Sequence, residues 1–477
     1  MSLKIIELAA QAPKYIEVDT QDIPACGPNY AGANRPYYKA TQLPSKILIV
    51  SSIRPYRNGY EKNRDEHELM QIDYVNPLTM KPTYCIVPND FLASILPAEQ
   101  LADLESKFEK AQFENLTESC RFYGQSGSDP EIFVTDENDQ VIPAFKFLGS
   151  KKEPSVLSKV PGAPYKLNNA YWDGFQAEFD TSPSPCLCYH ADSVQYGLKT
   201  VLNYAKQFNP KAKLSVKTVV DISPELMADA KPEHVQFGCM PSFNAYGMHG
   251  LDKSGDQVPF RPAGGHIHLS LDSGTTKEQI EKMVKGMDAI LGVACVSMFA
   301  SFDNPKRREL YGLAGEYRMP KHGMEYRVLS NAWLIHPVIM HMVFDLGRTA
   351  AMFGARDLLK YWQCDQDETI RIINTCDVAA ARQVLEKNKE LLLKLIAVRY
   401  EYNLKTFPHY FQPGEVNVEM FSKYTYNAFL NGLESIIKDP ADFEENWLLN
   451  GNWIPHSDSP SKNVMQVFKA KAQDGKI

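Results

Sequence analysis

The sequence predicts an α+β fold in which short strands build a sheet with one polar and one apolar face. Two observations support this class. Between residues 128 and 327, several short segments alternate polar and apolar side chains, as half-buried strands do. Beyond Pro337 the chain instead carries apolar residues at helical spacing, and Asp377 is placed to cap a helix with the apolar residues Ala381, Leu385, Leu392 and Leu395.

A chain of 477 residues is long enough for two or three domains. We expect an accessory mixed region at residues 1–115, a sheet domain at 116–355 and a mainly helical region at 356–477. Within the first region, residues 46–50 are typical of a short buried strand. The apolar residues after Pro97 predict an amphipathic helix, and neither segment carries a catalytic pattern.

Charge and composition narrow the possible partners. The net charge of −7 offers no basic surface to a nucleic acid or an anionic membrane. We expect no signal peptide, because residues 1–10 lack a cationic start and a long apolar run, and the apolar stretch at 289–300 is too short to span a bilayer. The nine scattered cysteines favour reduced thiols and a cytoplasmic protein.

Carboxylates mark the first two strand-like segments of the predicted sheet. Residues 128–134 form one such segment, with Asp129 and Glu131 among its polar residues, and a hairpin turn is expected at 136–140. In the second segment, 172–180, the side chains of Gln176, Glu178 and Asp180 share one face, opposite Phe175, Ala177 and Phe179. Asp192 is then expected to cap a helix with the apolar stripe Val194, Leu198, Val201 and Leu202.

A glycine pair followed by two histidines defines the third segment, at residues 261–270. In an extended strand His266, His268 and Ser270 point to one face, while Ile267, Leu269 and Leu271 point to a core. Two adjacent imidazoles are an arrangement that metal and phosphate chemistry use. The pattern fits two surface histidines on a half-buried strand equally well.

Cations are dense between residues 307 and 327. A capping box at 275–278 first predicts a helix whose buried stripe is Ile280, Met283, Val284, Met287, Ile290 and Leu291. Two short strands then repeat the tripeptide Glu-Tyr-Arg, at 316–318 and 325–327, and in each the Glu and the Arg share a face.

Taken together, the polar faces of these strands form one chemical pattern. Three glutamates and a histidine make an oxygen-rich set that suits Mg²⁺ or Mn²⁺ better than structural zinc. Arginines can bind phosphate and carboxylate oxygens in a bidentate manner. Phosphoryl transfer needs such a set and demands no Ser or Cys nucleophile. The sequence contains no Walker loop and no Rossmann glycine fingerprint.

The order of these motifs resembles the carboxylate–amine ligase superfamily, which contains glutamine synthetase and glutamate–cysteine ligase. The matching runs are Ser128-Asp129-Pro130-Glu131, Phe175-Gln176-Ala177-Glu178, Gly264-Gly265-His266-Ile267-His268, Tyr317-Arg318-Met319-Pro320 and Glu325-Tyr326-Arg327. In detail the chain is most similar to the phage-type carboxylate–amine ligases of type 2, as Gly149-Ser150-Lys151 and the run at 237–246 also indicate. The resemblance covers residues 120–340.

The resemblance implies a glutamine-synthetase-like, bent, mainly antiparallel sheet, with helices on its apolar face and with ATP and two or more metal ions on its concave face. It implies the following site residues: Glu131, Glu178, His266, Glu325 and Asp129 as metal ligands, His268, Arg318, Lys151 and Arg261 as nucleotide contacts, and Arg318 and Arg327 as catalytic residues. A counterpart of the ammonium-site loop of glutamine synthetase is not recognisable, so ammonia is not the expected amine.

The activity that the resemblance implies is ATP-dependent amide or peptide bond formation through an acyl phosphate, with release of ADP. One alternative is a metal-dependent amidohydrolase that uses His266 and His268 as zinc ligands together with further histidines such as His322 and His336. Another is a catalytically inactive interaction protein on the same fold. We expect a small-molecule or peptide carboxylate and amine as substrates, in the host cytoplasm if the chain is phage-encoded. The choice between Mg²⁺ and Mn²⁺ and the existence of a homo-oligomer stay open.

Overall fold

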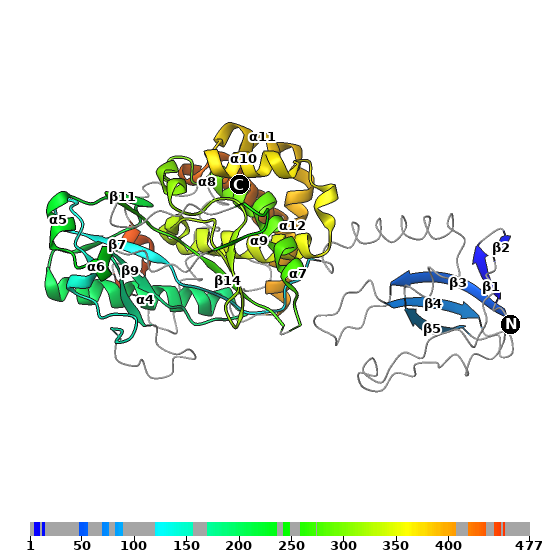
Figure 1. The fold of residues 1–477 in the computed structure, drawn as a ribbon. Helices are drawn as coiled ribbons and strands as arrows, with labels where there is room; N and C mark the ends of the chain where they lie inside the picture. The colour runs from blue at the N-terminus through cyan, green and yellow to red at the C-terminus, as the bar shows by residue number, and fades with distance from the viewer. Residues whose placement is uncertain are drawn as a thin grey trace. The chain divides into compact units, whose positions relative to one another are not determined.

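The computed structural model describes residues 120–155, 169–235, 242–248, 258–272, 274–406, 418–435, 443–449 and 452–453, together with the backbone of five earlier strands. Contacts along the chain define two compact units, Met1–Asn115 and Leu116–Ile477, which are drawn in Figure 1. The helix predicted after Pro97 and part of the run at 237–246 lie outside the described residues.

The first unit contains a five-stranded sheet in the order β2-β1-β3-β4-β5. Its β1 and β3 are parallel and its other neighbours are antiparallel. The strand predicted at 46–50 is confirmed as part of β3. The bounds are β1 Lys4–Ala9, β2 Ala12–Lys14, β3 Ile47–Pro55, β4 Leu69–Val75 and β5 Pro82–Pro88.

The second unit is built on two antiparallel sheets. The larger has the order β12-β15-β16-β14-β6 and the smaller the order β10-β7-β9-β8. A separate pair joins β11 (Val219–Asp221) to β13 (Phe260–Pro262). The bounds in the larger sheet are β6 Ser126–Ser128, β12 Phe243–Asn244, β14 Ile267–Ser270, β15 Glu316–Arg318 and β16 Gly323–Tyr326, and in the smaller β7 Glu131–Thr135, β8 Ala170–Asp173, β9 Gln176–Phe179 and β10 Lys213–Ser215.

The single strand expected at 128–134 is divided between these two sheets. It ends as β6 at Ser128 and begins again as β7 at Glu131. Pro130 has no N–H to donate to a ladder, so pairing is interrupted there. The N–H of Glu131 donates instead to the carbonyl of Gly264, 3.0 Å away. Asp129 therefore lies in the corner between the two sheets.

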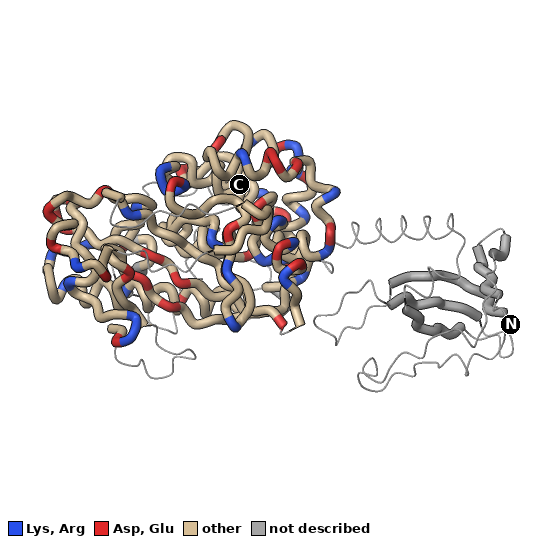
Figure 2. The backbone as a smooth tube through the Cα atoms, in the orientation of Figure 1, with Lys and Arg blue, Asp and Glu red and all other residues tan. Residues whose placement is uncertain are grey.

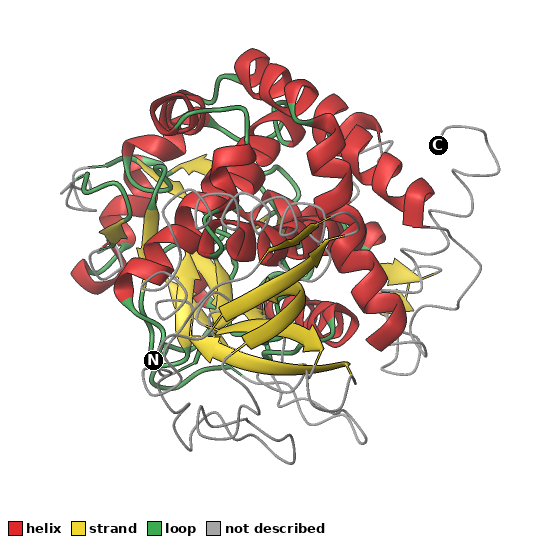
Figure 3. Ribbon diagram, turned by 90° about the vertical axis from the view of Figure 1, so that its right-hand side faces the viewer, coloured by secondary structure: helices red, strands yellow, loops and turns green. Residues whose placement is uncertain are grey.

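Helices account for most of the remaining described chain, and Figure 3 shows them beside the strands. The fold is therefore α+β, as predicted. The α-helices are α4 Leu187–Phe208, α5 Pro224–Asp229, α6 Pro232–Val235, α7 Lys277–Met287, α8 Val293–Met298, α9 Pro337–Ala355, α10 Gln366–Thr375, α11 Val378–Lys387, α12 Lys389–Thr406, α13 Val418–Asn431 and α14 Phe443–Asn446.

The shorter elements connect these helices. They are the 3₁₀ helices η3 Ala144–Lys146, η6 Pro305–Glu309, η7 Asn331–Ile335, η8 Leu358–Tyr361 and η9 Leu433–Ser435, the π-helix η5 Asp288–Gly292, and the strands β17 Leu448–Leu449 and β18 Asn452–Trp453. None of the helices in the described part of the chain has the length and apolar character that crossing a bilayer requires.

The apolar face of the larger sheet packs against α7, η5 and α9. Tyr317 and Tyr326 are fully buried on this face. The Tyr317 hydroxyl donates to Glu281 of α7 at 3.1 Å, and the Tyr326 hydroxyl donates to Asp288 of η5 at 2.7 Å. Burial of Asp288 raises the pKa of its carboxyl to about 7. The expected core stripe from Ile280 to Leu291 is buried, which confirms that prediction.

The predicted N-cap residues agree only in part with those in the structure. Asp377 caps α11 as predicted, accepting from the N–H of Ala380, but α11 ends at Lys387, so Leu392 and Leu395 belong to α12. The capping box is confirmed one residue later than expected, with Thr276 as N-cap and Gln279 as its partner. Asp192 is not a cap: α4 begins five residues earlier, after Cys186, and Asp192 is buried inside it. The N-cap residue Cys186 makes no side-chain cap hydrogen bond, so the sequence carries no cap signal at the true start.

Candidate functional site

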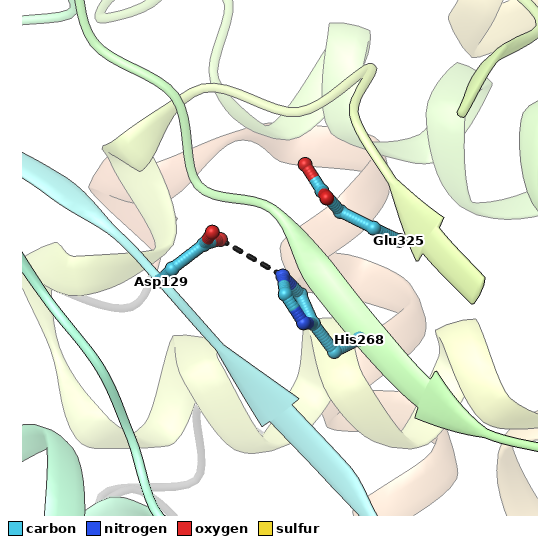
Figure 4. Close-up of side chains that lie close together, drawn as sticks. All are labelled: Asp129, His268 and Glu325. Atoms are coloured by element: carbon cyan, nitrogen blue, oxygen red, sulfur yellow. Dashed lines mark hydrogen bonds and ion pairs between the residues drawn. The ribbon is translucent and has the colours of Figure 1, made fainter. Parts of the chain in front are cut away.

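A row of charged side chains crosses the larger sheet. In the strand register Arg318 of β15 lies opposite Glu325 of β16, and Glu325 lies opposite His268 of β14. Directly opposed residues in a sheet have Cβ atoms about 5 Å apart, so the register alone brings these three side chains together. Asp129 reaches the same place from the corner after β6, and its Oδ1 lies 2.9 Å from Nε2 of His268 (Figure 4).

His266 and Arg327 complete this first group. Nδ1 of His266 lies 3.3 Å from Oδ1 of Asp129 and 3.3 Å from Oε1 of Glu325. The same Glu325 oxygen lies 3.1 Å from Nε of Arg327 and 3.4 Å from Nη2 of Arg318. One carboxylate oxygen thus has three nitrogen groups around it, and Glu325 and Arg327 are both buried. Buried charges at such spacing must compensate one another.

Charge pairing controls the protonation of Asp129 and His268. Burial alone would raise the pKa of the Asp129 carboxyl, but His268 and His266 hold that pKa well below its usual range. Burial alone would lower the pKa of His268, but Asp129 offsets this effect and raises the pKa. In the protein without a bound cation, the pair therefore favours an ionised carboxylate beside a protonated imidazole.

A second group of carboxylates lies on the smaller sheet, where Figure 2 marks acidic residues along β7 and β9. Glu131 lies opposite Glu178 in the register of β7 and β9, and both side chains are buried. Oε2 of Glu131 accepts from the N–H of Gly264 at 2.7 Å and from the Tyr311 hydroxyl at 2.7 Å. Oε1 of Glu178 accepts from the Tyr171 hydroxyl at 2.8 Å.

Asp173, which is not among the predicted site residues, joins the second group. The segment is a hairpin, with Asp173 opposite Gln176 across a tight turn in which Gly174 has a φ of 65°. The turn reverses the alternation that a single strand would have. Gly174 takes the first of the two central positions of the turn, where type II′ hairpins place glycine, and it is the signal that identifies the turn.

The electrostatics show that the second group concentrates negative charge. Burial, with the charges of Asp129 and Asp173, raises the pKa of the Glu178 carboxyl well above its usual range. Burial and the charge of Glu131 raise the pKa of Asp173 to about 7. Arg318 of the first group and Lys151 act in the opposite direction on Asp173. The two groups are therefore electrostatically coupled neighbours, with Asp129 and Arg318 between them.

The two remaining predicted residues occupy different environments. Nζ of Lys151 lies 3.4 Å from Oε1 of Glu178, and 70% of the side chain is exposed at the rim of the acidic group. Arg261 is buried, and its guanidinium donates to the carbonyl oxygens of Val258 at 2.7 Å and Phe260 at 2.9 Å, and to that of Val235 at 3.1 Å. These bonds give Arg261 a role in holding the chain around β13.

The donor set of the first group fits a divalent cation. Among the described residues, ligand atoms of Asp129, His268 and Glu325 all lie within 4.8 Å of one another, the spacing of a set that can hold one ion. Two carboxylates and one imidazole are ligands that Mn²⁺ and Mg²⁺ sites accept. This set contains His268, whereas the family resemblance implied His266, whose Nδ1 lies against both carboxylates.

The comparison with protein families agrees with the motif order. Residues 254–446, less than half of the chain, match the family described as phage phiEco32-like COOH.NH2 ligase-type 2. The matched part includes the His-x-His strand and both Glu-Tyr-Arg strands, and it confirms the resemblance inferred from the motifs. The match supports a carboxylate–amine ligase.

Other comparisons add little. A search of curated proteins finds no match. Among solved structures, a bifunctional glutathione synthetase from Pasteurella multocida aligns with 12% identity and a TM-score of 0.35, over 77% of this chain and 54% of that one. This chain thus spans about half the length of that protein. The low TM-score means that the alignment carries no argument about fold or activity.

Proposed function

We propose that this protein is an ATP-dependent carboxylate–amine ligase that forms an amide or peptide bond through an acyl phosphate and releases ADP. The observation that carries the proposal is the charged row of Arg318, Glu325 and His268, closed by Asp129, beside a second buried acidic group. So much buried negative charge around one corner is costly unless cations occupy it. The family match at residues 254–446 supports the same class of reaction.

Each group has a part in this chemistry. A substrate carboxylate oxygen attacks the γ-phosphorus of ATP, ADP leaves, and the substrate amine then displaces phosphate from the acyl carbon. Asp129, His268 and Glu325, with His266 beside them, would hold one divalent cation, and Glu131, Glu178 and Asp173 would hold another. Bound divalent cations neutralise phosphate charge and bring phosphate and carboxylate oxygens together.

The cationic side chains would serve the substrates. Arg318 is partly exposed beside Glu325, which suits it to contact the phosphoryl group during transfer. Arg327 is buried and holds Glu325, so its effect on the reaction would pass mainly through that carboxylate. Lys151, exposed at the rim, can follow a phosphate oxygen or a substrate carboxylate.

The amidohydrolase alternative receives less support from the geometry. It requires further histidine ligands besides His266 and His268. His336 is the N-cap of α9, and its Nδ1 accepts from the N–H of Val338 at 3.0 Å. The one set of described residues with cation-binding spacing contains two carboxylates and a single histidine, a composition more typical of magnesium or manganese than of zinc.

Isotope transfer tests the proposal directly. The protein is incubated with Mg-ATP and a panel of amino acids, polyamines and short peptides, and ADP release is followed. For an active pair, the carboxylate is labelled with ¹⁸O and the inorganic phosphate is analysed by mass spectrometry. Because the attacking carboxylate oxygen remains on phosphorus when the amine displaces phosphate, we expect ¹⁸O in the phosphate. Formation of AMP and pyrophosphate, or zinc-dependent amide cleavage without ATP, would contradict the proposal.

A further inference from the structure

The turn between β15 and β16 places an exposed histidine over the charged row. The N–H of Gly323 donates to the carbonyl of Pro320 at 3.0 Å, which closes the turn around Lys321 and His322. Gly323 has a φ of 143°, and a Cβ there would lie only 2.2 Å from the carbonyl oxygen of Leu269. A side chain at this position would push the turn away from β14, so glycine is required.

The backbone of His322 is also fixed to the strand that carries His268. The N–H of Leu271, just beyond the end of β14, donates to the carbonyl of His322 at 3.2 Å. The turn is thus held at two points beside β14. This anchoring gives the exposed side chain of His322 a defined place, which an exposed turn residue does not ordinarily have.

The two imidazoles meet edge to edge through one nitrogen of each ring. Nε2 of His322 lies 3.0 Å from Nδ1 of His268, and the rings are within 13° of parallel with centroids 5.1 Å apart. The other ring nitrogen of His268, Nε2, is the one that lies 2.9 Å from Asp129. His268 is therefore held at both nitrogens, by a carboxylate on the site side and by an imidazole on the solvent side.

We propose that His322 is a positioning residue that orients His268 for cation binding at the Asp129–His268–Glu325 set. This inference rests on the proposed function, because the proposed function supplies the cation that His268 would bind. A histidine that binds a metal through one nitrogen needs a partner for the N–H of the other, and such partners fix the ring and its tautomer. Nδ1 of His268 has His322 in that place.

A neutral imidazole suits this position because its Nε2 can accept the proton that Nδ1 of His268 offers. Without a cation, His268 beside Asp129 favours the form protonated at both nitrogens, and Nδ1 donates to His322. When Nε2 binds a cation, the proton of His268 stays on Nδ1, which again donates to His322. His322 accepts this bond without adding charge beside the site.

Two substitutions separate the hydrogen bond from the bulk of the ring. His322→Phe keeps an aromatic ring beside His268 but removes the bond, whereas His322→Gln keeps a group that can donate or accept. Lys321→Ala, in the same turn, is the matched control. Binding of Mn²⁺ alone is measured by calorimetry on the full chain, and thermal stability is measured without metal. In parallel, ¹⁵N spectra of histidine-labelled protein report the tautomer of His268, assigned with His268→Ala.

We expect His322→Phe to weaken Mn²⁺ binding by about tenfold or more, the usual effect of losing such a partner. The melting temperature without metal should stay near wild type because His322 is exposed. His322→Gln should recover most of the affinity, and Lys321→Ala should change none of it. At a pH high enough to leave His268 neutral, its nitrogen shifts in His322→Phe should indicate a mixture of tautomers.

Two results would overturn the inference, and they are distinguishable. If wild type binds Mn²⁺ and loses binding in His268→Ala, but His322→Phe binds as tightly as wild type, then the positioning role is wrong while the cation site stands. If wild type shows no Mn²⁺ binding that depends on His268, both the inference and the proposed cation site fail.

Discussion

The hydroxyl of Tyr311 donates to Oε2 of Glu131 at 2.7 Å, and this contact determines which oxygen of Glu131 can reach a cation. The same oxygen accepts from the N–H of Gly264 at 2.7 Å and from the amide of Gln176 at 3.3 Å. With three donors on Oε2, only Oε1 is left for a ligand. The ring of Tyr311 also lies under the guanidinium groups of Arg307 and Arg327, at 5.3 and 5.7 Å, which fixes its position.

Tyr311→Phe should therefore loosen Glu131 without removing it. We expect a loss of unfolding free energy of about 1–3 kcal/mol, the usual cost of removing a partner from a buried charged group. Mn²⁺ affinity should fall severalfold because the carboxylate is no longer held in one orientation. Tyr317→Phe is the matched control, since its hydroxyl bonds Glu281 on the opposite face of the sheet. Equal metal affinity in both variants would show that Tyr311 does not position Glu131.

Glu325 and Glu178 should respond in opposite directions when each is changed to Gln. Glu325 faces the nitrogens of His266, Arg318 and Arg327, so loss of its charge leaves a buried arginine poorly compensated. Breaking such a buried pair typically costs about 3–5 kcal/mol, and the isosteric Gln should keep the cost near the lower end. Glu325→Gln should therefore destabilise the metal-free protein, contrary to the expectation that a carboxylate lining a cleft contributes little to stability.

Glu178→Gln should instead stabilise the metal-free protein at neutral pH. Burial and the nearby charges of Asp129 and Asp173 raise the pKa of Glu178 above its ordinary value of 4.5. Below that pH the carboxyl is neutral in both the folded and the unfolded chain, so the substitution has little effect. As pH rises above it, the unfolded chain ionises freely and the folded wild type loses stability. Denaturant unfolding in a chelator at pH 4 and pH 7 measures this difference, and destabilisation by Glu178→Gln at pH 7 would contradict the assignment.

Both glutamate variants should lose Mn²⁺-dependent ATP binding, because each removes a charge that a cation needs. Calorimetric titration with ATP, with and without Mn²⁺, separates this effect from stability. Comparing Glu325→Gln with Glu178→Gln is informative because we expect opposite changes in the stability of the metal-free protein but the same loss of ATP binding. Normal ATP affinity in both variants would remove these residues from the proposed site.

Alternation along the sequence predicted which residues share the polar strand faces, but it could not predict their contacts. The faces of His268, Glu325 and Arg318 follow from period-two patterns within each strand. That these residues form one row depends on the register between β14, β16 and β15, which is set by turns and packing. The position of Asp129 could not be predicted from alternation either, because it results from the break between the two sheets at Pro130.

The structure also shows contacts of two further residues that the sequence pattern did not indicate. Asp173 was not among the predicted site residues, because segment 172–180 was treated as one strand, whereas the turn at Gly174 places Asp173 opposite Gln176. The resemblance grouped Arg261 with the nucleotide contacts, and that role stays a prediction. The bonds of its buried guanidinium to backbone carbonyls are not evident in the sequence, since one partner, Val235, lies at the end of α6.

Arg261→Met should destabilise the protein and leave cation affinity unchanged. The variant removes hydrogen bonds to three carbonyl oxygens, worth about 1 kcal/mol each, so we expect a loss of about 3 kcal/mol. Methionine retains the contact with the ring of Phe175, which lies 5.3 Å from the guanidinium. Denaturant unfolding and Mn²⁺ calorimetry distinguish the two effects. A selective loss of ATP binding at unchanged stability would instead show that Arg261 contacts the nucleotide.

Asp173 should release a proton when a divalent cation binds. Its pKa of about 7 results first from burial and then from the charge of Glu131. At pH 6 the carboxyl is mainly protonated, and a cation that stabilises the ionised form expels the proton. Above pH 8 no proton is left to expel, so proton release should decrease as pH rises through 7.

Calorimetry in two buffers of different ionisation enthalpy counts the protons released on Mn²⁺ binding. Glu178 also holds a proton more tightly than usual, so wild type alone would not identify the source. The difference between wild type and Asp173→Asn isolates the contribution of Asp173: the variant should release up to about one proton fewer at pH 6 and an equal number at pH 8. Asp221→Asn, at a strongly exposed carboxylate paired with Lys306, is the control and should match wild type at both pH values. Equal proton release by wild type and Asp173→Asn at pH 6 would mean that the cation does not reach this carboxyl, and the second acidic group would then consist of Glu131 and Glu178 alone.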